Sequence, residues 1–267
     1  MNALPTSDSP IGVFDSGVGG LPILQAIHKL LPHERLVYLA DTAYAPYGDK
    51  PAHDVQQRVL TIGQWFSAMP VKALVVACNT ATVLAIEALR AHSTVPVIGV
   101  EPAIKPAALA STTGVVGVLA TARTAASASV AKLVDAHGQR VQVLVQACPG
   151  LVDAIEGDAP QAHIATLLQA WLQPMLAQGA DHIVLGCTHY IVVRDLIQQL
   201  VGPNVTLVQP SEAVARQLMR QLASVGQLSS NSDVGDVVFY SSAADGNEAA
   251  GLMGRVWGEV APIHRTV

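Results

Sequence analysis

Short apolar runs that alternate with segments of helical period are the feature that most restricts the fold of this chain. The runs IGVFD (11–15), LVYLA (36–40) and LVVAC (74–78) have the length of a buried strand, and each ends in a polar or glycine-rich loop. The segment after the first run has apolar residues at helical spacing, namely Leu21, Leu24, Ile27, Leu30 and Leu31. This alternation predicts an α/β architecture with largely parallel sheets. It also predicts a strand in VPVIGVEPAIKPA (95–107) followed by a proline-rich loop, and a later strand in NVTLVQPSEAVARQL (204–218).

One short pattern occurs twice in the chain. VKALVVACNT (71–80) and ADHIVLGCTH (180–189) are both apolar strands followed by a small residue, a cysteine and a polar residue. We interpret them as one structural unit used twice, which predicts two pseudo-symmetric α/β domains. Ligands of such sheets bind at the carboxyl ends of the strands, so we expect the active site in the interdomain cleft.

The composition restricts the class of partner. Only 13% of the 267 residues are charged, the net charge is −5, and no basic cluster occurs, so neither nucleic acid nor a membrane is an expected partner. The first ten residues lack the basic start and apolar segment of a secretory signal, and no apolar run is long enough to span a membrane. Small-molecule substrates remain.

The three cysteines indicate a reducing environment. None lies in a CxxC pair, which argues against a disulfide framework and a structural zinc site, so we expect a cytoplasmic protein without a metal. Cys78 and Cys187 are the two that recur in the repeated pattern. If the domains are related by a pseudo-twofold axis, these two thiols face each other across the cleft. Two buried cysteines that merely pack as small apolar residues are the alternative.

Paired thiols suit one kind of chemistry. Inverting a stereocentre through a planar carbanion needs a base on one face and an acid on the other, and the two roles exchange with the direction of reaction. A thiol can serve in both roles, because a helix N-terminus or a polar partner can stabilise its thiolate. The pair therefore favours a reaction that inverts a stereocentre.

Four motifs occur in a characteristic order: DSGVGG (15–20), DTAYAPYG (41–48), ACNTAT (77–82) and GCTHY (186–190). Together they resemble the cofactor-independent glutamate racemases of the aspartate/glutamate racemase superfamily, over nearly the whole chain. The resemblance implies that L-glutamate and D-glutamate are interconverted by a two-cysteine mechanism that supplies D-glutamate for peptidoglycan. It also implies a discontinuous first domain (1–99 with 211–267), a second domain (100–210) and, as a further expectation, a homodimer.

The resemblance assigns roles to individual positions. It implies that Cys78 takes the α-proton from D-glutamate and that Cys187 takes it from L-glutamate. Asp15 and His189 match the polar neighbours that assist the thiols, and Glu156 matches a carboxylate close to that histidine. The matching substrate-binding positions are Asp15, Ser16, Tyr47, Gly48, Asn79, Thr80, Thr121, Thr124, Thr188 and His189.

Substrate recognition is expected to use neutral groups. None of the four motifs contains Lys or Arg, so the carboxylates of the substrate must meet backbone N–H groups at helix N-termini and hydroxyl or amide side chains. Gly17, Gly19 and Gly20 miss the GxGxxG spacing of a dinucleotide site. Pyridoxal phosphate is not implied, since the thiols supply acid and base. Cys148 matches no catalytic position and is expected to be structural.

The sequence departs from the family pattern at two places. Ile191 follows GCTHY where many members have proline, and Pro22 stands where threonine is common. Proline is tolerated in a first helical turn, whereas Ile191 affects the backbone that orients His189. Neither departure changes a side chain that the resemblance assigns to the site.

Other interpretations stay open at this stage. A relative acting on aspartate, a hydantoin or another α-substituted acid would keep both cysteines, whereas decarboxylating relatives need only one. A non-catalytic small-anion binding protein would need no paired thiols. Taken singly, Asp15 is compatible with a helix cap, His189 with a loop residue and Glu156 with a surface carboxylate. Nothing in the sequence points to an additional role such as binding a DNA topoisomerase.

Overall fold

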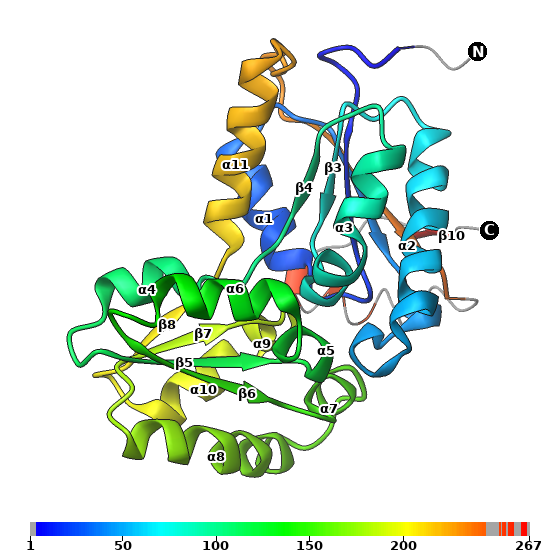
Figure 1. Ribbon diagram of the computed structural model, residues 1–267. Coiled ribbons are helices and arrows are strands. Elements are labelled where there is room, and N and C mark those ends of the chain that lie inside the picture. Colours follow the sequence, from blue (N-terminus) through cyan, green and yellow to red (C-terminus); the bar gives the residue numbers. More distant parts are fainter. Residues whose placement is uncertain (1–3, 244–250, 252, 255, 259–262, 266–267) are drawn as a thin grey trace. The chain divides into compact units, whose positions relative to one another are not determined.

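The computed structural model describes residues 4–243, 251, 253–254, 256–258 and 263–265 (Figure 1). The chain divides into two compact units: a first unit made of Met1–Val100 and Ser211–Val267, and a second unit made of Glu101–Pro210. Each unit is an α/β structure built on a parallel sheet, which confirms the predicted fold class. In the described part of the chain, no helix is long and apolar enough to cross a bilayer.

The first unit contains a six-stranded sheet in the order β10-β9-β2-β1-β3-β4, with parallel pairing throughout. Its strands are β1 (Ile11–Asp15), β2 (Leu36–Ala40), β3 (Ala73–Val76), β4 (Val97–Gly99), β9 (Val237–Ser241) and β10 (Ile263–Arg265). Its helices are α1 (Leu21–Leu30), α2 (Ala52–Ser67), α3 (Asn79–His92) and α11 (Ser211–Ser224), with the short 3-10 helices η1 (Thr42–Tyr44) and η2 (Tyr47–Asp49).

Helices cover both faces of this sheet. Because side chains alternate along a strand, Ile11 and Val13 of β1 pack in the cluster that includes α1 and α11, whereas Phe14 packs in the cluster with α2 and α3. Helix α1 buries the predicted Leu21, Leu24 and Ile27, and the adjacent Leu31 is also buried. Leu30, which shares this helical spacing, is 39% exposed, because it lies at the margin of the apolar stripe in the last turn.

The second unit contains a four-stranded parallel sheet in the order β6-β5-β7-β8. The strands are β5 (Val115–Ala120), β6 (Gln142–Ala147), β7 (His182–Leu185) and β8 (Thr206–Val208). The helices are α4 (Ile104–Ala110), α5 (Ala122–Ala125), α6 (Ala128–His137), α7 (Leu151–Glu156), α8 (Gln161–Ala177), α9 (His189–Val192) and α10 (Arg194–Val201). One apolar cluster joins the sheet to α4 and α6, and another joins it to α7, α8, α9 and α10.

The two sheets share one internal order. In the first sheet β1 lies between β2 and β3, and β4 lies beside β3. In the second sheet β5 lies between β6 and β7, and β8 lies beside β7. The connections therefore diverge between β1 and β3 and between β5 and β7, which is where ligands of open parallel sheets bind, at the carboxyl ends. β1 ends at Asp15 and β3 leads to Cys78, while β5 leads to Thr121 and β7 to Cys187.

Two segments differ from the sequence prediction. The proline-rich segment after β4, expected to be a loop, contains helix α4, because Pro106 lies in its first turn, where no helical hydrogen bond from the proline nitrogen is needed. The strand expected to end with VQPSEAVA stops at Val208, and Ser211 begins helix α11. Glu212 in the first turn favours this helix start through the helix dipole.

A buried ion pair joins segments at the amino end of the first sheet. The ammonium group of Lys72 contacts a carboxylate oxygen of Glu34 and donates a hydrogen bond to the Ser7 carbonyl. The other Glu34 oxygen accepts the Ser229 N–H at 2.8 Å. Both charged side chains are almost fully buried, so each depends on the other for compensation.

We predict that Lys72→Met destabilises the protein strongly, because it leaves the Glu34 carboxylate buried without its cation. The free energy of unfolding is expected to fall by about 3–5 kcal/mol. Arg35→Met is the matched control: it breaks the exposed Arg35–Asp236 pair and is expected to cost about 1 kcal/mol or less. Urea denaturation followed by circular dichroism measures both, and equal losses would contradict the assigned role of the buried pair.

Candidate functional site

The loop after β1 is organised by the Asp15 carboxylate. Oδ2 of Asp15 accepts the backbone N–H groups of Gly17 at 3.2 Å and Gly20 at 3.1 Å, and the side chain is fully buried. The Tyr38 hydroxyl donates to the Gly17 carbonyl at 3.0 Å. Asp15 therefore shapes the loop that leads into α1, in addition to any role in chemistry.

Gly20 is required by the space at this loop. A Cβ atom placed there would lie 2.8 Å from the Asp15 Cβ, 3.0 Å from the Ala77 Cβ and 3.0 Å from the Tyr38 hydroxyl. Real Cβ contacts are rarely this short, so a side chain at position 20 would displace Asp15 or the residue before Cys78. The second glycine of the GG pair thus allows the two loops to approach.

Cys78 lies at the N-terminus of a long helix. It is the N-cap of α3, and its Sγ accepts the Ala81 N–H at 3.5 Å. The Cys78 Sγ and the Ser16 Oγ are 3.6 Å apart, and the thiol is 5% exposed. The amide groups and dipole of a helix N-terminus stabilise an anion, so this position favours the thiolate of Cys78.

The residues after Cys78 are buried polar groups. Asn79 Nδ2 donates to the Val100 carbonyl at 3.4 Å, and Thr82 Oγ1 accepts the Val100 N–H at 3.1 Å. These two bonds attach the start of α3 to the end of β4. Thr80 is 3% exposed. The ACNTAT motif therefore performs helix capping and strand attachment as well as any substrate contact.

A charged network holds the loop after β2. The Tyr47 hydroxyl donates to Asp41 Oδ2 at 2.5 Å, and Arg58 of α2 donates to both Asp41 oxygens, at 2.8 and 2.5 Å. Burial, together with the charge and hydrogen bond of Asp41, raises the pKa of Tyr47 above its ordinary value. The phenol is therefore protonated at any working pH, and Gly48 follows it in η2.

Cys187 follows β7 through Gly186, which has no space for a side chain. A Cβ at Gly186 would lie 2.7 Å from the Leu119 carbonyl oxygen, and the Gly186 N–H donates to that same oxygen at 2.7 Å. The end of β7, directly before Cys187, is therefore packed closely against β5. Thr188, the N-cap residue of α9, is 1% exposed.

His189 connects Cys187 to Glu156. The His189 Nδ1 lies 3.9 Å from the Cys187 Sγ, and its Nε2 lies 2.7 Å from the Glu156 Oε1. His189 is 2% exposed. A carboxylate at Nε2 favours the tautomer that carries the proton there, which leaves Nδ1 as an acceptor facing the thiol. The arrangement can move a proton between sulfur and imidazole, and Glu156 stabilises the imidazolium.

Ile191 takes part in the turn that carries His189. Its N–H donates to the Thr188 carbonyl at 3.2 Å, a bond that a proline at this position could not form. Its side chain packs in the apolar core of the second unit. The departure from the family pattern therefore adds a hydrogen bond to α9.

Thr121 and Thr124 bond to each other. Thr121 caps α5, accepting the Thr124 N–H at 3.3 Å, and its hydroxyl donates to the Thr124 hydroxyl at 3.1 Å. Both side chains are buried at the carboxyl end of β5. The local geometry is that of a helix cap, and it places two hydroxyl groups at this edge of the sheet.

Cys148, at the end of β6, is chemically different from the other two cysteines. Burial raises the pKa of its thiol to about 12, so it stays protonated at neutral pH. Its carbonyl accepts the Tyr190 hydroxyl at 3.4 Å. These features fit the structural role expected for it. Among the described residues, no group of three or more His, Cys, Asp or Glu side chains is arranged to hold a metal ion.

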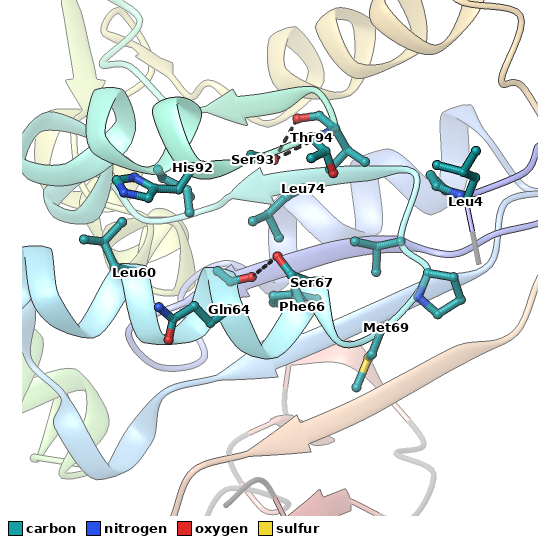
Figure 2. Close-up of a pocket in the computed structure, with 16 residues that line it drawn as sticks. Leu4, Leu60, Gln64, Phe66, Ser67, Met69, Leu74, His92, Ser93 and Thr94 are labelled. Carbon is teal, nitrogen blue, oxygen red and sulfur yellow. Dashed lines mark hydrogen bonds between the residues drawn. The ribbon is translucent and has the colours of Figure 1, made fainter. Parts of the chain in front are cut away.

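A separate pocket of about 350 Å³ lies in the first unit, between the C-terminal parts of α2 and α3 (Figure 2). Its walls include Leu60 and Phe66 of α2 and Leu89 of α3, with Leu74 near the start of β3. This is the amino end of β3, whereas Cys78 follows its carboxyl end. All the predicted site residues belong to the described part of the chain, and none lines this pocket.

The structure thus gathers the predicted residues into two groups, one in each unit. The group at the carboxyl end of the first sheet contains Asp15, Ser16, Tyr47, Gly48, Cys78, Asn79 and Thr80. The group at the corresponding end of the second sheet contains Thr121, Thr124, Glu156, Cys187, Thr188 and His189. Neither Asp41 nor Arg58 was among the site residues expected from the sequence. Asp41 begins the DTAYAPYG motif, but Arg58 is a helix residue 17 positions away, and only the fold pairs them.

Comparison with known proteins identifies the family. Residues 21–218 match the family model described as Asp/Glu/Hydantoin racemase. The chain is 47% identical over 259 residues to a glutamate racemase of Stutzerimonas stutzeri, covering 96% of both chains. It is 48% identical over 237 residues to the Methylococcus capsulatus glutamate racemase, covering 88% of both.

Solved structures give the same result. A glutamate racemase isoform of Bacillus anthracis superposes with a TM-score of 0.87 at 30% identity, covering 98% of both chains. The Francisella tularensis glutamate racemase, solved with D-glutamate, gives a TM-score of 0.85 at 26% identity with 98% coverage of both. The Escherichia coli glutamate racemase, solved with L-glutamate and an activator, gives 0.83 at 28% identity, covering 96% of this chain and 98% of that one.

We predict that Gly20→Ala destabilises the protein by about 1–3 kcal/mol, because the added methyl group overpacks the space beside Asp15. The unfolding midpoint in urea is the measurement. Gly251→Ala serves as the control, since a Cβ at that helical position meets nothing within 4 Å. A Gly20→Ala variant as stable as the control would show that the loop after Asp15 can accommodate a methyl group at position 20 without loss of stability.

Proposed function

This chain belongs to the Asp/Glu/hydantoin racemase family, and we propose that it interconverts L-glutamate and D-glutamate by cofactor-independent proton transfer between two cysteines. The observation that carries the proposal is the pair of thiols that follow the third strand of each sheet, each in contact with a group suited to proton transfer or to thiolate stabilisation. The relatives named above, at 47–48% identity, make glutamate the favoured substrate over aspartate or a hydantoin.

Cys78 would take the α-proton from D-glutamate. The N-terminal amides of α3 support its thiolate, and Ser16 contacts its sulfur. Asp15 ends β1 directly before Ser16 and is the nearby carboxylate that the family resemblance associates with this thiol. Once the proton has left, the α-carbon is planar and can be protonated from its other face.

Cys187 would take the α-proton from L-glutamate. Before that step, the proton of the Cys187 thiol passes to Nδ1 of His189, which leaves the thiolate as base, and Glu156 stabilises the imidazolium that results. In the opposite direction His189 returns a proton to Cys187, which then protonates the carbanion. The two thiols thus exchange the roles of base and acid.

The α-proton of an amino acid is very weakly acidic, so the site must also stabilise the enediolate that forms. Preorganised hydrogen-bond donors serve this purpose. The groups available are the N–H groups at the start of α3 and the amide and hydroxyl side chains of Asn79, Thr80 and Thr188. We assign substrate binding to these groups, together with Ser16, Tyr47, Gly48, Thr121 and Thr124.

In the family that this chain resembles, the reaction supplies D-glutamate for peptidoglycan. We propose that role here, with a cytoplasmic location. A homodimer is proposed from the resemblance alone. The substrate is a small molecule, consistent with the glutamate complexes of the Francisella and Escherichia proteins.

The first test follows the α-proton of L-glutamate by proton NMR in deuterated water, without added cofactor and with L-aspartate in a parallel tube. We predict loss of the α-proton from glutamate and formation of the D-enantiomer. Cys78→Ala and Cys187→Ala are expected to lower racemisation by about 1000-fold or more, because each removes an acid and base.

Cys148→Ala is the control for these variants, because burial raises the pKa of the Cys148 thiol to about 12 and the proposed mechanism gives it no role in proton transfer. It is expected to keep activity within about threefold of the wild type, since loss of the sulfur changes packing alone. Loss of the α-proton from aspartate alone would show that aspartate, not glutamate, is the substrate. No exchange with either amino acid by folded, reduced wild-type protein would contradict the proposed function.

A second test concerns the His189–Glu156 pair. Glu156→Gln keeps a hydrogen-bond acceptor but removes the charge that stabilises the imidazolium, so kcat/KM is expected to fall by about 10- to 100-fold. The racemisation equilibrium requires the fall to be equal in both directions. The α-deuterium isotope effect on kcat/KM distinguishes the step at Cys187 from the step at Cys78. We expect this isotope effect to rise for L-glutamate, whose α-proton Cys187 removes, and to fall for D-glutamate, whose α-proton Cys78 removes, because the Cys187 step becomes more rate-limiting.

Glu87→Gln, at an exposed ion pair with Arg90, is the matched control for this measurement. It is expected to leave kcat/KM and both isotope effects unchanged. If Glu156→Gln shifted the two isotope effects in the same direction, Glu156 would not act on the Cys187 side of the reaction.

A further inference from the structure

Arg58 of α2 holds three residues of the loop that carries Tyr47 and Gly48. Its guanidinium donates to both oxygens of Asp41, and its Cζ lies 3.8 Å from the centre of the Tyr44 ring. Asp41 in turn accepts the Tyr47 hydroxyl. One helical side chain therefore fixes the loop after β2 at its first, fourth and seventh residues.

The hydrogen-bond geometry determines where the phenol proton lies. The Tyr47 and Asp41 oxygens are 2.5 Å apart, so a proton must lie between them. Asp41 is bonded to the guanidinium through both oxygens and is therefore ionised, which leaves Tyr47 as the donor. A phenol has a single proton, so Tyr47 cannot donate to a substrate carboxylate at the same time.

This result changes the meaning of the Tyr47-Gly48 pair. The phenol is bonded within the protein, so its contribution to substrate binding is to hold the backbone of the loop. Gly48, the next residue in η2, has only its backbone to offer. The loop then binds the substrate through main-chain groups, and their position depends on Arg58.

We propose that Arg58 is a positioning residue for the proposed racemisation: acting through Asp41, it holds the Tyr47-Gly48 segment in the conformation that receives glutamate. This inference rests on the proposed function. Burial makes the arrangement stiff, since Asp41 is fully buried and the Arg58 side chain is only 16% exposed. Removing the cation leaves a buried carboxylate whose remaining partner is Tyr47, and the loop must rearrange.

The test measures kcat and KM for D-glutamate in the wild type and in Arg58→Gln, Arg58→Lys, Tyr47→Phe and the double variant Arg58→Gln/Asp41→Asn. Arg58→Gln is expected to raise KM by about tenfold or more with kcat within about threefold, because the loop supplies binding that is equal in ground and transition states. Arg58→Lys keeps the charge and is expected to have an intermediate KM.

The other two variants separate positioning from direct contact. Tyr47→Phe leaves the Arg58–Asp41 pair in place, so its KM is expected to rise less than that of Arg58→Gln. The double variant removes the unpaired carboxylate, so its KM is expected to return toward the wild-type value. Arg216→Gln, which breaks an exposed ion pair with Glu212, is the control and should not change KM.

Several outcomes would overturn the assignment. A Tyr47→Phe variant with a larger rise in KM than Arg58→Gln would show that the phenol donates directly to substrate. An Arg58→Gln variant with an unchanged KM and a lower amount of folded protein would show a purely structural role. If Arg58→Gln does not fold, Arg58→Lys provides the test. A wild-type KM in Arg58→Lys would show that the two hydrogen bonds from the guanidinium to Asp41 are not needed to position the loop.

The same experiment separates this inference from the proposed function. Wild-type protein that racemises glutamate while Arg58→Gln keeps its KM would overturn only the role of Arg58. Wild-type protein that neither exchanges nor racemises glutamate would overturn the proposed function, and the role of Arg58 with it.

Discussion

The parallel order of the strands is the constraint on which both groups of site residues depend. With β1 between β2 and β3, the loops after all three strands open at one edge; Asp15 ends β1, and Asp41 and Cys78 lie in the loops after β2 and β3. The order of β6, β5 and β7 does the same for the second unit. Two glycines make the arrangement possible, because Gly20 and Gly186 lie where a Cβ would meet a neighbouring loop or strand.

The two thiols occupy similar positions but are supported in different ways. Cys78 depends on the N-terminus of a 14-residue helix, which stabilises negative charge without transferring a proton. Cys187 precedes a helix of only 4 residues and instead contacts His189, whose second nitrogen is held by Glu156. One thiol therefore lies at a helix N-terminus and the other beside an imidazole, within an otherwise repeated framework.

Charge at the site is compensated within the protein. Arg58 is bonded to Asp41, so its cation does not serve as a simple carboxylate receptor, and the neutral recognition expected from the motifs is compatible with its presence. At the opposite end of the first sheet, Lys72 and Glu34 compensate each other in the same manner. Buried charges in the first unit thus position loops, which is the role proposed for Arg58.

The sequence alone determined the α/β class, the strand and helix series and the repeated cysteine pattern, because these depend on local hydrophobic periodicity and on short motifs. Local signals misled at α4, where Pro106 was compatible with a first turn, and at α11, where a strand was expected.

Only the tertiary structure decided which side chains meet. The contact of Arg58 with Asp41 joins residues 17 positions apart and was not expected from the sequence. The contact of His189 with Glu156, 33 positions apart, was expected only from the family resemblance. No local pattern records these pairs, because hydrogen bonds between distant segments depend on strand order and on the packing of helices against the sheet.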